Sequence, residues 1–475
     1  MNIRATGAPP ALGEFPPTAV EAAKDIAAGR LSPTELVTLC LNRAEALQPL
    51  LHTYVTLDAE GALAAAAKAE AEIARGHYRG PLHGIPFAVK DNYDAAGLPT
   101  TGGSRLHDGS VAAEDSTMVA RMKAAGAVLM GKLGTWEYGT GNGGEYFDLP
   151  ITTTRNPWDP SRFAGGSSTG TGAAVASGTT VLALGSDTTG SVRLPASACG
   201  CVGIRATHGL MPRAGLLANC YAMDVPGPIT WTVEEAALIT EAVSGYDPRD
   251  PSSAEVPPFV RPAAMGGSIR GLRIGVIRDI GPGFVPDAAM TAAFEDGLTV
   301  LEALGADLRE TVLPLSAKEQ FAISSIIGPA ESAAIHEEEI SNRATVMGYG
   351  LREKLLKGSM IRAADYIAAQ RQRRVIAAAM DAMMTSFDAV ITYGACHVAP
   401  PIDDEAAMIN FTMETALTPF SLSGHPSMVQ CTGFTPAGLP LHWQIAAPFF
   451  GEATMFSIAA AFEAATPHRQ RRPSL

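Results

Sequence analysis

Helix-like and strand-like hydrophobic patterns alternate along most of the chain. Residues 17–76 have the apolar spacing of helices, and Ser32, Pro33 and Glu35 are the N-cap, first-turn proline and capping-box glutamate of one of them. From residue 82 onward, short apolar runs typical of buried strands appear, the first being "LHGIPFAVKDNY" (82–93). This alternation predicts an α/β protein.

The second half of the chain continues the alternation of helix-like and strand-like patterns after one irregular segment. The segment "DPRDPSSAEVPPFVRP" (248–262) is rich in proline and charge and predicts a linker. Helices are expected to fill 287–385, strands and loops return in 387–450, and a closing helix is expected over 452–465.

Composition and charge narrow the classes of function. The chain has 475 residues, 47% of them hydrophobic, and a formal net charge of −13, which argues against nucleic acid as the main partner. The basic cluster "HRQRR" (468–472) is interpreted as a solvated tail. No apolar stretch reaches the roughly 18 residues of a membrane span.

The cysteines point to the compartment. Six are scattered along the chain, with no C-x-x-C pair and no H-E-x-x-H motif, so no metal site is expected. Together with an N-terminus that lacks a signal-peptide pattern, this predicts a reduced, cytoplasmic protein.

A glycine-rich stretch, "FAGGSSTGTGAAVASG" (163–178), is the first candidate for chemistry. It has no lysine for a phosphate-binding P-loop and too few glycines for a dinucleotide-binding turn. Residues 166–170 match the G-x-S-x-G elbow with Ser168 as nucleophile, but the segment before them is not the apolar strand that an elbow requires.

A second turn offers a serine alternative. The segment 182–200 reads as an apolar strand followed by a Gly/Ser/Thr turn that contains Ser191. A helix between the two turns can bring both to one end of a sheet. A reacting serine needs a base, and His83, His208, His397 and His425 have no evident acid partner in the sequence.

Lysine is the other candidate base. Lys90 ends the apolar run "GIPFAVK", where burial can lower the pKa of its ammonium group by several units. The competing interpretation is a lysine at a strand end that points into water. Position alone leaves both open.

Four separated segments carry a resemblance that bears on this choice. They are "GIPFAVKDN", "RFAGGSSTGTGAAVASG", "GSDTTGSVRLPASACGCVGIRATHG" and "GPITWTVEEAALI", and in order and spacing they resemble the amidase signature family. The resemblance runs from about residue 20 to 465 and includes 421–452. It implies an α/β fold with one large mixed central β-sheet covered by helices on both faces.

The resemblance also implies a mechanism. Ser191 becomes the nucleophile, Lys90 the base and Ser167 the bridging serine after a cis peptide bond. Lys90 draws a proton through Ser167 from Ser191, which attacks an amide carbonyl, and water then hydrolyses the acyl-enzyme. The implied oxyanion hole is formed by the backbone N–H groups of Thr188, Thr189, Gly190 and Ser191. The implied supporting residues are Gly166, Ser168, Asp187 and Arg193.

One amidase signature domain over 1–475 is the organisation that the resemblance implies. Within it we expect an N-terminal helical region (1–76), a catalytic core (77–247) with the signature region 160–210, a helix-rich region (263–385) and a C-terminal region that completes the sheet (386–475). No cofactor and no metal are expected. The expected partner is a small-molecule amide substrate, with no nucleic acid and no membrane, and a homodimer is compatible with the family.

Several positions depart from the family's usual pattern. Thr189 and Thr169 stand where glycine is usual, Cys201 replaces an apolar residue, and "RATHG" (205–209) replaces a usual Lys-Pro-Thr. None of the three catalytic positions is altered, so the departures concern substrate choice.

Loops at the sheet edge are expected to form the substrate pocket. They are 134–146, 214–226 and 393–420, and they offer a set of large apolar or aromatic residues that could equally be ordinary core: Trp136, Tyr138, Tyr221, Met223, Tyr393 and Phe411. Glu137 and Glu414 are candidates for recognising a cationic or amino group.

Three functions stay open. The first is a stand-alone amidase acting on small carboxamides or aryl/alkyl amides, with an ester hydrolase as a variation. The second is the glutaminase subunit of a tRNA-dependent amidotransferase, which needs partner subunits. The third is a non-catalytic binding protein on the same fold, which the intact Lys90, Ser167 and Ser191 disfavour.

Overall fold

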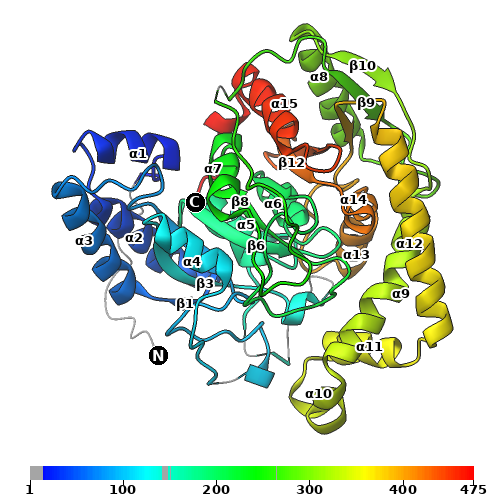
Figure 1. Cartoon of the computed structure of the whole chain (residues 1–475), viewed down its shortest axis with the longest axis horizontal. Coiled ribbons are helices and arrows are strands. Elements are labelled where there is room, and N and C mark those ends of the chain that lie inside the picture. Colours follow the sequence, from blue (N-terminus) through cyan, green and yellow to red (C-terminus); the bar gives the residue numbers. More distant parts are fainter. Residues whose placement is uncertain (1–13, 108, 142–147, 150, 264) are drawn as a thin grey trace.

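One mixed eleven-stranded sheet organises the structure (Figure 1). The computed structural model describes residues 14–107, 109–141, 148–149, 151–263 and 265–475. From edge to edge the strand order is β1 (Tyr54–Leu57), β3 (Val128–Leu133), β2 (Pro86–Lys90), β6 (Leu182–Asp187), β8 (Val225–Thr230), β7 (Val202–Arg205), β12 (Ser427–Phe434), β13 (Pro440–Ala446), β11 (Ala389–Thr392), β9 (Arg273–Ile277) and β10 (Asp307–Glu310). A separate pair consists of β4 (Arg155–Asn156) and β5 (Asp159–Phe163).

Strand direction explains where a site can form. Strands β3, β2 and β6 are parallel neighbours, whereas β8, β7, β12 and β13 form an antiparallel centre. The carboxyl ends of parallel strands meet at one edge of a sheet. The end of β2 at Lys90 and the turn that follows β6 therefore lie at the same edge.

Helices cover both faces of this sheet. Trp443 of β13 packs on Phe462 of α15, whereas the next residue, Gln444, accepts a hydrogen bond from Arg193 of α6. Successive side chains of a strand point to opposite faces, so α15 and α6 cover opposite sides. The predicted α/β fold is confirmed.

The helices are bounded as follows: α1 (Ala19–Ala27), α2 (Pro33–Leu51), α3 (Ala59–Ala74), α4 (Thr117–Ala124), α5 (Thr169–Ser177), α6 (Arg193–Cys199), α7 (Val233–Val243), α8 (Ala288–Ala303), α9 (Ala317–Ile335), α10 (Glu337–Asn342), α11 (Tyr349–Ser359), α12 (Ala363–Met384), α13 (Glu405–Met413), α14 (Thr418–Ser423) and α15 (Glu452–Ala465). The capping box predicted at Ser32 and Glu35 is present, with Pro33 in the first turn. The closing helix has the predicted bounds.

Two segments differ from the sequence expectation, one near the N-terminus and one in the centre of the chain. The region 17–76 is not wholly helical, because β1 pairs with β3 between α2 and α3. The segment 248–262 contains no helix or strand, but it is packed against the protein rather than free. Asp250 is buried and its carboxylate accepts the Arg213 amide at 2.7 Å.

The basic C-terminal cluster is also packed, which corrects the solvated-tail interpretation. The Arg472 guanidinium lies 3.8 Å and the Arg469 guanidinium 4.4 Å from the centre of the Trp231 ring. Arg469 also donates to the carbonyls of Trp231 and Gly200. Guanidinium groups stack on aromatic faces, and here they hold the chain end against Trp231, between β8 and α7, and against Gly200, directly after α6.

A group of helices extends beyond the sheet at one side, as the yellow and yellow-green ribbons of Figure 1 show. It consists of α9, α10, α11 and α12.

Within the described ranges, no helix combines the length and apolar character needed to cross a membrane.

Candidate active site

Lys90 is the last residue of β2, a strand whose five residues are all buried. Its Nζ donates to Ser167 Oγ at 2.7 Å and to Ser186 Oγ at 3.0 Å. It forms no ion pair with any described carboxylate. Burial lowers the pKa of Lys90 to about 7, and the charges of Asp224 and Asp187 oppose this shift. A large share of Lys90 is therefore a neutral amine at neutral pH, able to accept a proton.

Ser167 is aimed at Lys90 by a tightly packed turn. The Gly166–Ser167 peptide bond is cis, as the resemblance implied. A Cβ at position 166 would lie 2.1 Å from the Trp136 ring, so only glycine fits there. Trp136 is thus part of the packing behind the turn, where its amide donates to the Ser167 carbonyl at 3.1 Å and its ring stacks on Phe163.

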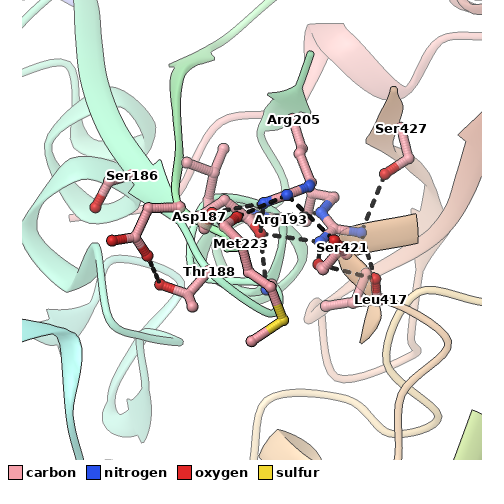
Figure 2. Close-up of polar contacts among 12 residues, drawn as sticks. Ser186, Asp187, Thr188, Arg193, Arg205, Met223, Leu417, Ser421 and Ser427 are labelled. Atoms are coloured by element: carbon pink, nitrogen blue, oxygen red, sulfur yellow. Dashed lines mark hydrogen bonds and ion pairs between the residues drawn. The ribbon is translucent and has the colours of Figure 1, made fainter. Parts of the chain in front are cut away.

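The turn that contains Ser191 is fixed by a buried ion-pair network (Figure 2). Asp187 lies at the end of β6, and the Arg193 guanidinium contacts both of its carboxylate oxygens, at 2.9 and 3.0 Å. Arg205 Nη1 lies 3.3 Å from the same carboxylate. Burial would raise the pKa of Asp187, but the two guanidinium groups hold it well below its usual range. Asp187 and Arg193, which the resemblance implied to be supporting residues, thus form an ion pair.

Arg193 ties this turn to the C-terminal part of the sheet. It donates to the Leu417 carbonyl, Gln444 Oε1 and the hydroxyls of Ser421 and Ser427. Arg205, which replaces the family's usual lysine, is also completely buried and donates to the carbonyls of Asp187 and Met223. Because these bonds join the turn to several different elements, the backbone around Ser191 is rigid.

Backbone N–H groups in this turn divide into two sets. The Gly190 amide donates to Asp187 Oδ1 at 2.8 Å, so it faces the ion pair and is not free for an oxyanion. Among the described residues, the amides of Thr188, Thr189 and Ser191 have no hydrogen-bond acceptor. The expectation for Gly190 is corrected on this geometry, and three donors remain.

Ser168 holds the two turns together. Its amide donates to the Ser191 carbonyl at 3.2 Å, and its hydroxyl donates to the Ser186 carbonyl at 3.2 Å. Ser191 is half-buried and can be reached from solvent, whereas Ser168 is completely buried. The strand nearest before Ser168 is β5, which is not part of the large sheet, so the elbow alternative has no structural support.

A cavity of about 620 Å³ opens beside these groups. Lys90, Ser167, Ser186 and Thr188 line it, and Ser191 lies three residues beyond Thr188 along the same turn. Of the six residues expected to form the pocket, Tyr138 and Tyr221 line this cavity.

The other four pocket candidates are core residues and do not line it. Trp136 packs behind Gly166, Met223 is completely buried, Tyr393 stacks on Phe294, and Phe411 packs edge-on against Phe163. Residues 142–146 of the expected pocket loop 134–146 lie outside the described residues. Large apolar residues in loops beside a wide sheet are needed as core, which the sequence pattern does not separate from pocket lining.

The two glutamates considered for cation recognition have partners within the protein. Glu137 is buried and accepts from the Ser104 hydroxyl at 2.5 Å and the Gly348 amide at 2.9 Å. Glu414 lies 2.9 Å from His397 Nε2, and Asp287 lies 3.0 Å from His397 Nδ1. His397 therefore has acid partners that the sequence did not reveal.

No group of three or more His, Cys, Asp or Glu residues suited to a metal ion occurs within the described part of the chain. All six cysteines are buried and free.

Comparison with known proteins identifies the family. The family model described as Amidase matches residues 35–456. The chain belongs to the amidase family. It is an amide-hydrolysing enzyme that carries the amidase signature.

Relatives of this amidase cover nearly its whole length. The A subunit of the glutamyl-tRNA(Gln) amidotransferase from Chloroflexus aggregans is 36% identical over 479 residues, covering 95% of this chain and 96% of the relative. A native peptide amidase from Stenotrophomonas maltophilia has a TM-score of 0.84 and 28% identity, with 96% of this chain and 98% of that chain covered.

A third similar structure belongs to a vestigial protein complex that reveals the evolutionary origins of an s-triazine catabolic enzyme. Its TM-score is 0.87 at 31% identity, with 94% of this chain and 98% of that chain covered. The amidase family thus includes enzymes with different substrates on this fold. The substrate of this chain therefore depends on the residues that line its own cavity.

Three polar residues of this amidase were missed by sequence reasoning. Ser186 Oγ accepts from both Lys90 Nζ and Asn92 Nδ2, each at 3.0 Å. Asp224 accepts the Thr188 hydroxyl at 2.6 Å. Ser186 lies five residues before Ser191 and Asn92 two residues after Lys90, and that proximity is the signal that could have found them. Asp224 is 33 residues from Ser191, and no local pattern marks it.

Proposed function

We propose that this protein hydrolyses the C–N bond of a small carboxamide or aryl/alkyl amide through an acyl-enzyme on Ser191. Lys90 is the base and Ser167 relays the proton between them. One observation carries the proposal: Lys90 is buried, pairs with no carboxylate in the described ranges, and donates to the Ser167 hydroxyl at 2.7 Å.

The proton path follows from the donor and acceptor capacities of the groups. Neutral Lys90 accepts the Ser167 proton while Ser167 accepts the proton of Ser191, whose oxygen attacks the amide carbonyl. The amides of Thr188, Thr189 and Ser191 are available to stabilise the oxyanion. The proton then returns through Ser167 to the leaving amine, and water hydrolyses the ester bond to Ser191.

The cavity supports a small substrate with a second polar group. At about 620 Å³ it has the size of a small-molecule site. Leu216, Leu217 and Ile335 line it, and it also contains Tyr138 and His336, whose buried hydroxyl and ring nitrogens have no hydrogen-bond partner among the described residues. Buried polar groups are nearly always hydrogen-bonded, so these atoms are candidates to bind the polar part of a substrate.

Covalent labelling tests the nucleophile. The purified protein is treated with a fluorophosphonate probe, and the adduct is mapped by peptide sequencing. We expect one adduct on Ser191, which is lost in Ser191→Ala and retained in the matched control Ser168→Ala. An adduct on Ser168 would refute the mechanism and support the elbow alternative.

A glutaminase subunit is the second candidate, because the similar curated proteins include A subunits of glutamyl-tRNA(Gln) amidotransferases at 34–36% identity. Such a function would bring protein partners to this chain. Ammonia release from glutamine is compared with that from simple aliphatic and aromatic carboxamides, using the chain alone. Faster hydrolysis of the carboxamides supports the stand-alone amidase, whereas a clear preference for glutamine favours the second candidate.

A further inference from the structure

Asp224 lies at the junction between the nucleophile turn and the loop that walls the cavity. Its Oδ1 accepts the Thr188 hydroxyl at 2.6 Å, and its Oδ2 accepts the amides of Asn219 and Cys220, both at 2.8 Å. Thr188 follows Asp187 directly and begins the turn that ends in Ser191. One carboxylate thus joins the cavity loop to the turn.

Asp224 also lines the cavity, as does the base Lys90. Two carboxylates stabilise the charged form of Lys90, and Asp224 has the larger effect of the two. The other belongs to Asp187, which two guanidinium groups already compensate. Lys90 and Asp224 form no ion pair, so this charge acts through space without fixing the amine in its protonated form.

Three basic residues lie near Asp224. Its negative charge acts to raise the pKa of Lys354 of α11 and of Arg205 of β7. Arg213 donates to its backbone carbonyl at 3.5 Å. Lys354 binds Asn219 Oδ1, and Asn219 Nδ2 donates to the Thr188 hydroxyl at 3.1 Å. Lys354 therefore supports the same turn through Asn219. Cys220 is a further titratable neighbour, and burial raises its pKa well above the usual range, so it stays a neutral thiol.

We propose that Asp224 is a positioning residue of the reaction, which holds the Thr188 end of the nucleophile turn and supplies a negative charge that acts on the Lys90 base. The inference rests on the proposed function, since it takes Ser191 as nucleophile and Lys90 as base. Two separable effects follow, one from the hydrogen bond to Thr188 and one from the charge.

The charge effect has a definite sign. A negative charge near an ammonium group raises its pKa, so neutralising Asp224 lowers the pKa of Lys90. Labelling of Ser191 requires neutral Lys90, and its rate falls below that pKa. We call the part of the pH profile in which the labelling rate falls as pH is lowered the acid limb. In Asp224→Asn the acid limb moves to lower pH, by about one pH unit if the charge contributes about 1.4 kcal/mol.

The experiment measures the second-order rate of fluorophosphonate labelling at Ser191 between about pH 5.5 and pH 9, together with kcat and KM on a hydrolysed amide. Asp224→Asn is expected to move the limb down and to lower kcat about tenfold with little change in KM, as loss of one charge-assisted hydrogen bond would. Asp224→Glu keeps the charge and is expected to keep the limb in place. Thr188→Val is expected to lower kcat without moving the limb.

Glu331→Gln is the matched control. Glu331 holds the same loop from α9 by accepting the Ala222 amide at 2.9 Å, and it is not among the charges that act on Lys90. It is expected to leave the limb unmoved. A limb that stays at the wild-type pH in Asp224→Asn overturns the inference, as does an equal shift in Glu331→Gln.

Failure of the proposed function would look different. In that case wild-type Ser191 carries no adduct, whereas failure of this inference leaves Ser191 labelled and only the pH profile unmoved. If Asp224→Asn does not fold, the limb in Asp224→Glu and Thr188→Val decides, because a limb that moves in Thr188→Val contradicts the assignment to charge.

Discussion

Lys90 ends β2 and Lys132 is the last residue but one of β3, a neighbouring parallel strand, yet the surroundings of the two lysines differ. Both are buried, and β3 pairs Lys132 with Val89, so the two lysines point to opposite faces of the sheet. Lys132 has an ion pair with Asp91 at 2.9 Å and also binds the Pro99 carbonyl and the Thr100 hydroxyl. Among the residues that the structure describes, the partners of Lys90 are all hydroxyl groups.

The difference shows what makes a buried lysine a base. Burial lowers the pKa of both, but at Lys132 the charge of Asp91 and its hydrogen bond act against the shift. At Lys90 no carboxylate of the described residues is in contact to do so, and the pKa falls to about 7. Burial together with the absence of an ion pair therefore distinguishes a reactive lysine from a structural one.

Removing the two amines separately gives the largest expected contrast. Lys90→Met should lower kcat/KM by about 10³-fold, because a positioned general base typically contributes 10²–10⁴-fold. Lys132→Met should keep the wild-type kcat when the rate is divided by the amount of Ser191 that reacts with the fluorophosphonate probe. The check is steady-state kinetics normalised to labelled sites, and equal losses in both variants would remove the distinction.

Stability should respond in the opposite way. Lys132→Met leaves the buried Asp91 carboxylate without its cation, which should cost about 3 kcal/mol or more in the free energy of unfolding. Lys90→Met removes a buried amine for which the described part of the chain offers no paired carboxylate, so it should cost little or stabilise. Denaturant unfolding at pH 7 measures both, and a Lys132→Met protein as stable as the wild type would contradict the ion-pair assignment.

A pH dependence of stability should belong to Lys90. Its folded-state pKa of about 7 lies below the ordinary lysine value, so folding releases a proton between these two pH values. The unfolded chain binds more protons there, and stability rises with pH. Relative to Lys90→Met, the wild type should gain about 2 kcal/mol from pH 7 to pH 9. A constant difference across this range would place the pKa of Lys90 near its ordinary value.

Ser186→Ala should have the smallest effect of the set. It removes the second hydroxyl that accepts from Lys90 but leaves the bond to Ser167. We expect about a tenfold loss of kcat, equivalent to one hydrogen bond to a charged group. Thr180→Ala, which removes a buried hydroxyl whose partners are the Pro86 and Leu182 carbonyls, is the matched control and should leave kcat unchanged.

The sequence predicted elements that depend on local pattern. The capping box at Ser32 and the closing helix follow from the order of a few residues, and both are present. β1 was missed because it is a four-residue strand between two helices, stabilised by pairing with the distant β3. Strand pairing of this kind has no local signal.

For the site, the sequence reduced the number of candidate bases but did not identify the base by itself. Its position at the end of an apolar run made Lys90 a candidate base, and the family resemblance favoured that interpretation over a lysine that points into water. The run near Lys132 is equally apolar. Asp91, which separates the two lysines chemically, is adjacent to Lys90 in sequence but pairs with Lys132 in space. Asp224 and the inward-facing Gly190 amide depend on how loops pack, which a single sequence does not specify.

The protonation state of Lys90 is the central claim, and it can be measured directly. Lysine side chains labelled with ¹³C at Cε are followed by NMR as pH is raised, and the Lys90 and Lys132 resonances are assigned as those lost in Lys90→Met and Lys132→Met. We predict that the Lys90 resonance titrates near pH 7 and the Lys132 resonance at higher pH. A Lys90 resonance that titrates together with the surface lysines, near the ordinary value of about 10.4, would contradict Lys90 as the neutral base.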